Sequence, residues 1–351
     1  MTINKKDSII CITTSNTNDT SDTIHDYCFE KGGFIMDKKK VIKFTLITYV
    51  IAWLIQIPAA IYYINHQGAF GKSVFQVGAA ISMFAPLLAT LITNHTLKGM
   101  GWKPNVKGNV KWIIFAILVP VIIVVTGAVL FYSIYPDLFD PTASLYLKKT
   151  GADMGVDLLG QLEEKGVSPQ TYVVISAFSA LTGGSFFNMF VAVGEEAGWR
   201  GFLYPELRKG FGRVTTWIIA GIIWAAFHFP LMLIAGYEYG TDYLGAPVLG
   251  LIVFSVNCIV NGALHEIVYD KTKCIWVAAL LHGAINAWAN IPFALWNINA
   301  DGRAEKLMIL GPAANGLIGM IPLVIITVIM AAQVLRDDKK IEISELTADM
   351  V

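Results

Sequence analysis

The sequence predicts an all-α, polytopic membrane protein with about eight transmembrane helices. Of its 351 residues, 55% are hydrophobic and only 15% are charged, and the mean hydropathy is +0.58. This balance lies outside that of ordinary soluble domains. Apolar runs of about 20 residues recur along the chain, and each can cross about 30 Å of hydrocarbon as a helix. The formal net charge of zero gives no indication of a nucleic-acid partner.

The first 35 residues differ in composition from the rest of the chain. They are rich in Ser, Thr, Asn and Asp, and they lack the features of a secretory signal. We predict that residues 1–35 are a disordered leader or lie outside the native protein. The second interpretation rests on residues 31–36, whose codons can spell a bacterial ribosome-binding site followed by a start at Met36. The alternative is a genuine polar tail.

From Met36 onward, apolar runs alternate with polar segments. They predict a single transmembrane domain over residues 36–340 and a short cytoplasmic tail over residues 341–351. No internal repeat is visible, so a duplicated transporter architecture is not supported. The predicted spans are residues 44–64, 73–94, 112–135, 171–193, 215–236, 247–268, 274–296 and 307–334.

Lysine and arginine are distributed unevenly between the two sets of loops, with sixteen on one side and six on the other. Cytoplasmic loops carry an excess of these residues, so the chain is predicted to be a multi-pass protein of the cell membrane with both termini in the cytoplasm. The suspected ribosome-binding site suggests that the cell is a bacterium. The sixteen residues are Lys38, Lys39, Lys40, Lys43, Lys98, Lys103, Lys107, Lys111, Arg208, Lys209, Arg213, Lys271, Lys273, Arg336, Lys339 and Lys340.

Charged side chains are nearly absent from the spans, but Glu195, Glu196 and Arg200 follow the fourth apolar run. A charge at mid-membrane costs about 2.5 kcal/mol or more, so each of them is a candidate functional residue. Helical spacing places Glu196 and Arg200 at i, i+4 with the acid first, which favours an ion pair. Glu195 is left without a local cation, and a buried carboxylate of this kind is a candidate general base.

Histidines occur in two further spans. His228, in WAAFHFP, is expected towards mid-bilayer, and the neighbouring Pro230 favours a kink in the helix. Taken alone, His228 fits a hydrogen-bonded core residue equally well. His282 and Asn286, in LLHGAIN, lie at i, i+4 and share a helix face, which suits hydrogen bonding to a developing oxyanion. Polar contact between helices is the alternative interpretation.

We interpret the other polar residues in the spans as structural rather than catalytic. His265 and Glu266 begin like a metalloprotease helix motif, but Tyr269 stands where the second histidine is required. Both fall near a predicted membrane boundary, where charge is tolerated. Asn257 and Asn261 are assigned to hydrogen bonding between helices. The spacing of the four cysteines predicts neither a disulfide nor a zinc site.

Three segments together resemble the motifs of a known family. EEAGWR at residues 195–200 fits EExxxR, the aromatic-xxx-His of residues 224–228 fits FxxxH, and HGAIN at residues 282–286 fits HxxxN. In order and spacing they are similar to the motifs of the CPBP family, the type II CAAX prenyl proteases and bacteriocin-processing intramembrane proteases. The resemblance covers residues 171–296, the predicted protease core.

The resemblance implies an all-helical fold with catalytic residues in an intramembrane cavity, and hydrolysis of prenylated proteins or peptide precursors. It implies that Glu195 and His228 activate the attacking water, and that His282 and Asn286 stabilise the oxyanion.

The same resemblance implies that Glu196 and Arg200 hold the site together. Trp224 replaces the phenylalanine of the second motif and keeps an aromatic ring, so we expect little effect. Trp199 falls at a variable position of the first motif and is expected to be neutral.

The candidate site residues are compatible with two forms of water activation, one by a carboxylate with a histidine and one by a bound metal ion. Amide hydrolysis needs a deprotonated water, an acid for the leaving amine and donors to the oxyanion, and a carboxylate with histidines supplies all three. Glu195, His228 and His282 also make a His₂Glu set that would hold Zn²⁺ with an open position, if a metal is bound. A serine or cysteine nucleophile is less favoured, because none lies beside these histidines in the chain.

The leading prediction is therefore an intramembrane endopeptidase that acts in the lipid bilayer on a membrane-associated peptide or a CAAX-type protein substrate. In a bacterium, peptide maturation or self-immunity to a bacteriocin fits better than a prenylated substrate. One alternative is a non-catalytic bacteriocin-immunity or scaffold protein, which would keep its phenotype after replacement of Glu195. Another is a proton-coupled carrier, which would show uptake that depends on a pH gradient.

Overall fold

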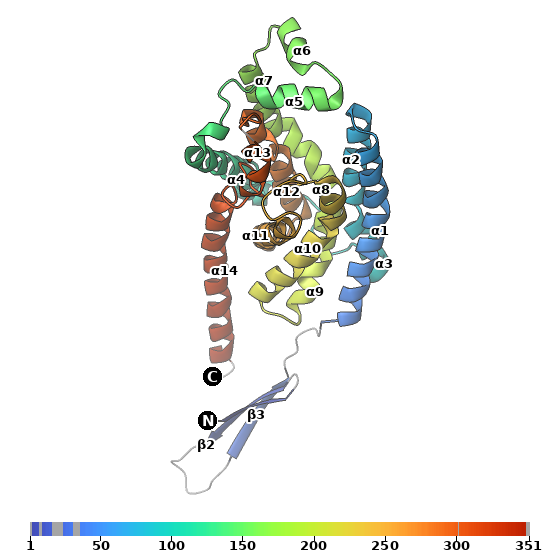
Figure 1. Cartoon of the computed structure of the whole chain (residues 1–351). Helices are drawn as coiled ribbons and strands as arrows, with labels where there is room; N and C mark the ends of the chain where they lie inside the picture. Colours follow the sequence, from blue (N-terminus) through green and yellow to red (C-terminus); the bar gives the residue numbers. More distant parts are fainter. Residues whose placement is uncertain (1, 7–8, 16–23, 31–35, 301, 349–351) are drawn as a thin grey trace. The chain divides into compact units, whose positions relative to one another are not determined.

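Figure 1 shows the computed structural model of the chain, which describes residues 2–6, 9–15, 24–30, 36–300 and 302–348. The chain divides into two units, Met1–Met36 and Asp37–Val351.

The described residues of the first unit form a three-stranded antiparallel sheet. β1 (Thr2–Lys6) pairs with β2 (Ile9–Ser15), and β2 pairs with β3 (Ile24–Glu30). The Ile, Thr and Tyr residues of these strands favour extended chain. That the leader is disordered or lies outside the native protein stays a prediction. Residues 31–35, which carry the start-site hypothesis, lie outside the described residues. Met36 as the native start stays a prediction.

The second unit is helical throughout its regular structure, which confirms the all-α membrane fold. Residues 169–208 form one continuous helical run, because π-helical turns η2 (Ala180–Gly184) and η3 (Trp199–Leu203) join its three α-helices. The α-helices are α1 (Lys38–Asn65), α2 (Ala69–Ser82), α3 (Ala85–Asn94), α4 (Val106–Ile134), α5 (Leu145–Met154), α6 (Leu158–Glu164), α7 (Pro169–Ser179), α8 (Ser185–Gly198), α9 (Tyr204–Arg208), α10 (Arg213–Ala235), α11 (Val248–Thr272), α12 (Ile275–Trp288), α13 (Arg303–Lys306) and α14 (Ile321–Ala348).

Within the described residues, six helices are long and apolar enough to cross a membrane, and they coincide with the first six predicted spans. The predicted count of eight is not confirmed. In the seventh predicted span, α12 has only 14 residues, about 21 Å of helix, and gives way to the 3₁₀-helix η4 (Ile291–Leu295). In the eighth, α14 begins only at Ile321, because the preceding segment turns at Gly311 (φ +93°) and Pro312.

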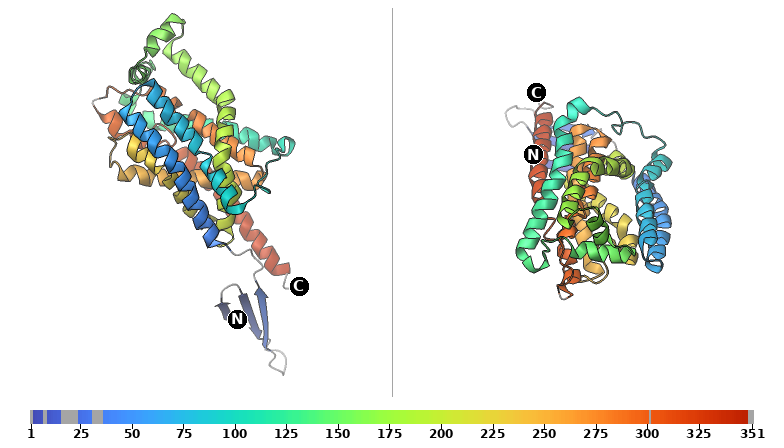
Figure 2. Two further views of the ribbon diagram at one scale, coloured as in Figure 1. Left: turned by 90° about the vertical axis from the view of Figure 1, so that its right-hand side faces the viewer. Right: turned by 90° about the horizontal axis from the view of Figure 1, so that it is seen from above.

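The centre of the helical unit is built from α8, α10, α11 and α12 (Figure 1). α1, α2 and α3 cover one side of this group, and α4 and α14 cover the other, as the two further views in Figure 2 show. α8 and α12 approach closely at Gly283, where an added Cβ would come within 2.4 Å of the backbone nitrogen of Met189. This close packing sets the distance between the residues that α8 and α12 carry.

Charged helix ends meet at one end of the unit. Arg213, which begins α10, forms ion pairs with Glu266 of α11 (2.7 Å) and Asp338 of α14 (2.9 Å). The backbone N–H of Asp37 donates to Glu206 (2.9 Å), which places the start of α1 beside α9. These contacts gather segments that carry the predicted cytoplasmic charges. The side of the membrane that they face stays a prediction.

Candidate active site

A cavity of about 520 Å³ lies among the central helices. It is lined by Glu195 from α8, His228 from α10, and His282 and Asn286 from α12. Three helices that are far apart in sequence thus bring the predicted water-activating and oxyanion residues to one space. Cavities of this size, largely apolar with a few polar groups, are where ligands bind.

The carboxylate of Glu195 is held by two indole groups. Its Oε2 accepts hydrogen bonds from Nε1 of Trp199 (2.9 Å) and Nε1 of Trp224 (2.6 Å). Glu195 is 1% exposed, and its Oε1 carries no such bond in the described part of the chain. Both tryptophans were expected to matter little, and the structure corrects this. Trp199 lies four residues after Glu195 on the same helix, so the spacing could have identified it.

Glu196 and Arg200 form the ion pair that their spacing predicts. Nη1 of Arg200 donates to Oε1 of Glu196 (2.9 Å), and both side chains are completely buried. Nδ1 of His282 donates to the same oxygen (2.8 Å). The Arg200 guanidinium also lies over the rings of Tyr204 (5.0 Å) and Trp224 (4.7 Å). Glu196 is therefore neutralised by Arg200 and connects α8 to α12.

Among the described residues, His228 forms no hydrogen bond with this pair, and it lies among aromatic rings. Its Nδ1 donates to the carbonyl oxygen of Trp224 (3.1 Å), so Nε2 carries the lone pair of the neutral ring. The ring lies edge-on to Phe254 (5.2 Å between centroids) and parallel to that of Tyr237 (6.5 Å). Pro230 lies inside α10, one turn before the helix ends at Ala235.

His265 joins the site, although its sequence context suggested only a boundary residue. It is 1% exposed, lines the cavity and lies against His282, with 5.6 Å between ring centroids. Its Nδ1 donates to the carbonyl oxygen of Asn261 (2.7 Å). Asn257, Asn261 and His265 follow one another at intervals of four residues along α11, and this shared face is the signal that could have revealed His265.

The neighbouring Glu266 plays no part in the cavity. Its carboxylate accepts hydrogen bonds from Arg213 (2.7 Å) and from Nε1 of Trp217 (3.1 Å) at the charged end of the unit. Asn257 donates to the carbonyl oxygen of Ala314 (2.8 Å), and Asn261 donates to Asn257 (2.9 Å). The two asparagines thus do not bridge two helices as expected: Asn261 pairs within α11, and Asn257 contacts the turn before α14. Both also line the cavity.

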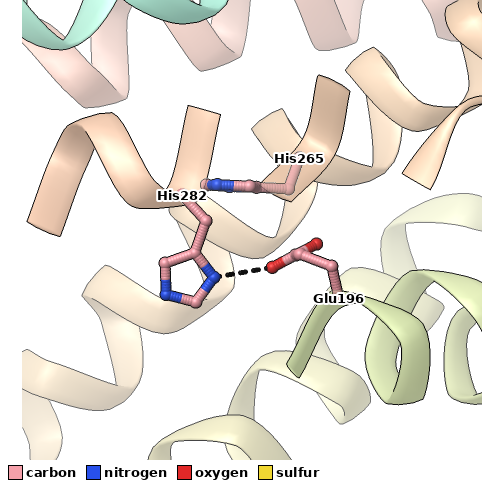
Figure 3. Close-up of side chains that lie close together, drawn as sticks. All are labelled: Glu196, His265 and His282. Carbon is pink, nitrogen blue, oxygen red and sulfur yellow. Dashed lines mark hydrogen bonds and ion pairs between the residues drawn. The ribbon is translucent and has the colours of Figure 1, made fainter. Parts of the chain in front are cut away.

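One group of potential metal ligands is present in the described part of the chain, and it differs from the predicted set. Ligand atoms of Glu196, His265 and His282 lie within 4.8 Å of one another (Figure 3). The predicted set of Glu195, His228 and His282 does not form such a group. The reason is that two indoles hold the carboxylate of Glu195, while His228 is turned towards Phe254 and Tyr237.

Comparison with known proteins agrees with this geometry. Residues 171–288 match the sequence model of the family described as Type II CAAX prenyl endopeptidase Rce1-like. The matched segment runs from α7 to the last residue of α12 and contains the three motifs. The match confirms the resemblance to the CPBP family. A search of curated proteins finds no match to the chain.

Proposed function

We propose that the protein is an intramembrane endopeptidase that hydrolyses a membrane-associated peptide or protein. The observation that carries the proposal is the convergence of Glu195, His228, His282 and Asn286 on one cavity inside a bundle of membrane-spanning helices. The similarity of residues 171–288 to CAAX prenyl endopeptidases supports peptide hydrolysis over transport. A bacteriocin or another short peptide is the preferred substrate if the source is bacterial.

In the proposed reaction, Oε1 of Glu195 takes a proton from water, and Nε2 of His228 is the second acceptor at the cavity wall. The water oxygen bonds to the peptide carbonyl carbon, and the π electrons of the carbonyl move to its oxygen. The C–N bond then breaks, and the proton passes to the leaving nitrogen. Glu195 suits the role of base because neutral indoles orient its carboxylate without cancelling its charge.

The developing oxyanion would be stabilised by His282 and Asn286. Nδ1 of His282 donates to Glu196, so Nε2 is the ring nitrogen left for the substrate. Nε2 donates a hydrogen bond to the oxyanion when both ring nitrogens carry a proton. Donors of this kind, fixed before the reaction begins, supply a large share of rate acceleration in acyl transfer. Arg200 keeps Glu196 ionised and in place.

The test is peptide cleavage by the purified full chain in proteoliposomes, with a library of quenched fluorescent peptides as the probe. Glu195→Gln is expected to lower kcat at least about 100-fold, because general base catalysis contributes factors of this order or more. Glu163→Gln, an exposed residue of α6, is the matched control and should cleave at the wild-type rate.

Two outcomes contradict the proposal. One is equal cleavage by the wild-type chain and Glu195→Gln. The other is a cellular immunity phenotype that persists in Glu195→Gln at normal protein levels, which would favour the non-catalytic scaffold.

A further inference from the structure

Buried polar atoms at the cavity and in the adjoining Glu196–Arg200 pair lack hydrogen-bond partners. One is a donor, Nε of Arg200, and three others are Oε2 of Glu196, Oδ1 of Asn261 and Nε2 of His265. Nε2 of His265 bears a lone pair because Nδ1 of that ring donates to a carbonyl oxygen. All three atoms are therefore acceptors. A buried polar group without a partner is destabilising by about 1–3 kcal/mol, so several acceptors at one place indicate a ligand that is a donor or a cation.

Two of these acceptors belong to the group formed by Glu196, His265 and His282. One carboxylate oxygen and two imidazole nitrogens are a donor set typical of catalytic zinc sites, which keep a further position open. In Figure 3 the side chains of Glu196 and His265 converge beside His282. The ligand atoms come from α8, α11 and α12, so the folded bundle assembles them.

The surroundings of these side chains are those that metal ligands require. A metal-binding histidine normally donates its other ring N–H to a carbonyl or carboxylate, and His265 donates to the backbone of Asn261. Ligating carboxylates are themselves hydrogen-bonded, and Arg200 holds Oε1 of Glu196 while Oε2 stays free. Imidazole nitrogens favour zinc and other transition metals over magnesium or calcium.

We propose that Glu196, His265 and His282 form a binding site for a divalent transition-metal ion, with Zn²⁺ as the best fit. Arg200 binds Oε1 of Glu196, so Oε2 is the carboxylate oxygen left for the ion. When bound, the ion would supply Lewis-acid polarisation of the substrate carbonyl in place of a hydrogen bond from His282, which then serves as a ligand. Glu195 keeps the role of base, because it is outside the ligand set.

Direct metal measurement tests the site without any substrate. The full chain is purified in detergent without a histidine tag, stripped with a chelator, loaded with Zn²⁺ and desalted. Metal content is read by mass spectrometry, and affinity by titration with Co²⁺, whose visible absorption reports nitrogen and oxygen ligands. The wild-type chain should retain about one ion, as a three-ligand site with an open position holds a single metal.

Two histidine variants locate the site. His265→Ala should bind at least about tenfold more weakly, the lower end of what loss of supporting groups alone produces. His228→Ala is the matched control, since His228 also lines the cavity, and it should bind as the wild type does. If His265→Ala elutes as an aggregate in size-exclusion chromatography, His265→Gln replaces it, because glutamine keeps a polar side chain of similar reach.

A wild-type chain that retains no metal overturns the inference. So does loss of metal in His228→Ala, which would point to the set of Glu195, His228 and His282. The two proposals fail separately: absence of metal binding with cleavage intact overturns the metal site and leaves the protease, whereas metal binding without cleavage of any peptide leaves the metal site and overturns the protease.

Discussion

Glu195 and Glu196 are neighbours in sequence but are held by different kinds of groups. A guanidinium and an imidazole hold Glu196, and the guanidinium neutralises it. Two neutral indoles hold Glu195, which has no cationic hydrogen-bond partner among the described residues. The i, i+4 spacing predicts the partner of Glu196, and the same spacing from Glu195 leads to Trp199. Trp224 comes from another helix, so no local rule could pair it with Glu195.

Replacing Trp224 with phenylalanine, the residue of the family motif, tests the importance of the indole N–H. The variant keeps an aromatic ring beside Arg200 but loses the 2.6 Å hydrogen bond to Glu195. We expect kcat to fall about tenfold with little change in KM, because a hydrogen bond to a charged group contributes about 1.5–3 kcal/mol. Steady-state cleavage of a peptide found by the library measures both constants.

The control for this variant is Trp217→Phe. Trp217 also donates its indole N–H to a buried glutamate, Glu266, but it lies outside the cavity. Its replacement should leave kcat unchanged. An equal fall in both variants would mean that the effect is one of general packing, and no fall in Trp224→Phe would remove the orienting role of the indole.

At the scale of helices, apolar runs predict where spans lie but not where helices break. The first six spans match because each run coincides with a long helical segment, although a turn at Met83 and Phe84 divides the second span into α2 and α3. Residues 274–296 and 307–334 are equally apolar, yet Pro292, Gly311 and Pro312 end or delay their helices. The π-turns η2 and η3 are defined by their backbone hydrogen bonds. The spacing of apolar side chains in the sequence therefore does not predict them. Such turns occur often at functional sites, and η3 contains Arg200.

The contact between α8 and α12 at Gly283 makes a second prediction. In Gly283→Ala, the new methyl group would meet backbone atoms of Ser185, Asn188 and Met189 at 2.4–2.8 Å. The helices must separate, so we expect the free energy of unfolding to fall by about 1–3 kcal/mol. The separation also stretches the bond between His282 and Glu196 and lowers kcat. Thermal unfolding in detergent and peptide cleavage measure the two effects.

Gly183→Ala is the matched control, since an added Cβ there meets nothing within 4 Å. Alanine favours helix over glycine by up to about 1 kcal/mol, so this variant should unfold at the same or a higher temperature. Equal unfolding temperatures for Gly183→Ala and Gly283→Ala would show that the close approach of α8 and α12 does not limit stability.

At the scale of the whole molecule, the distribution of charge and the contacts between helices agree. The positive segments were assigned to one side from loop composition alone. The ion pairs of Arg213 and Lys271 with Asp338 and Asp337 bring the ends of α10, α11 and α14 together. Long-range pairs of this kind could not be predicted, because they join residues more than 60 positions apart. Counting charged residues in the loops predicts which helix ends share one side of the membrane, but it does not predict which residues pair.

The last prediction concerns the side of the membrane that this charged end faces. By the positive-inside rule it is cytoplasmic, so Lys340 lies inside the cell and Lys165, in the loop between α6 and α7, lies outside. In a chain whose four native cysteines are replaced by serine, Lys165→Cys should react with a membrane-impermeant maleimide on intact cells. Lys340→Cys should react only after lysis. Both lysines are exposed, so access to the reagent depends on membrane side alone. The reverse labelling pattern would invert the predicted topology and place both termini outside the cell.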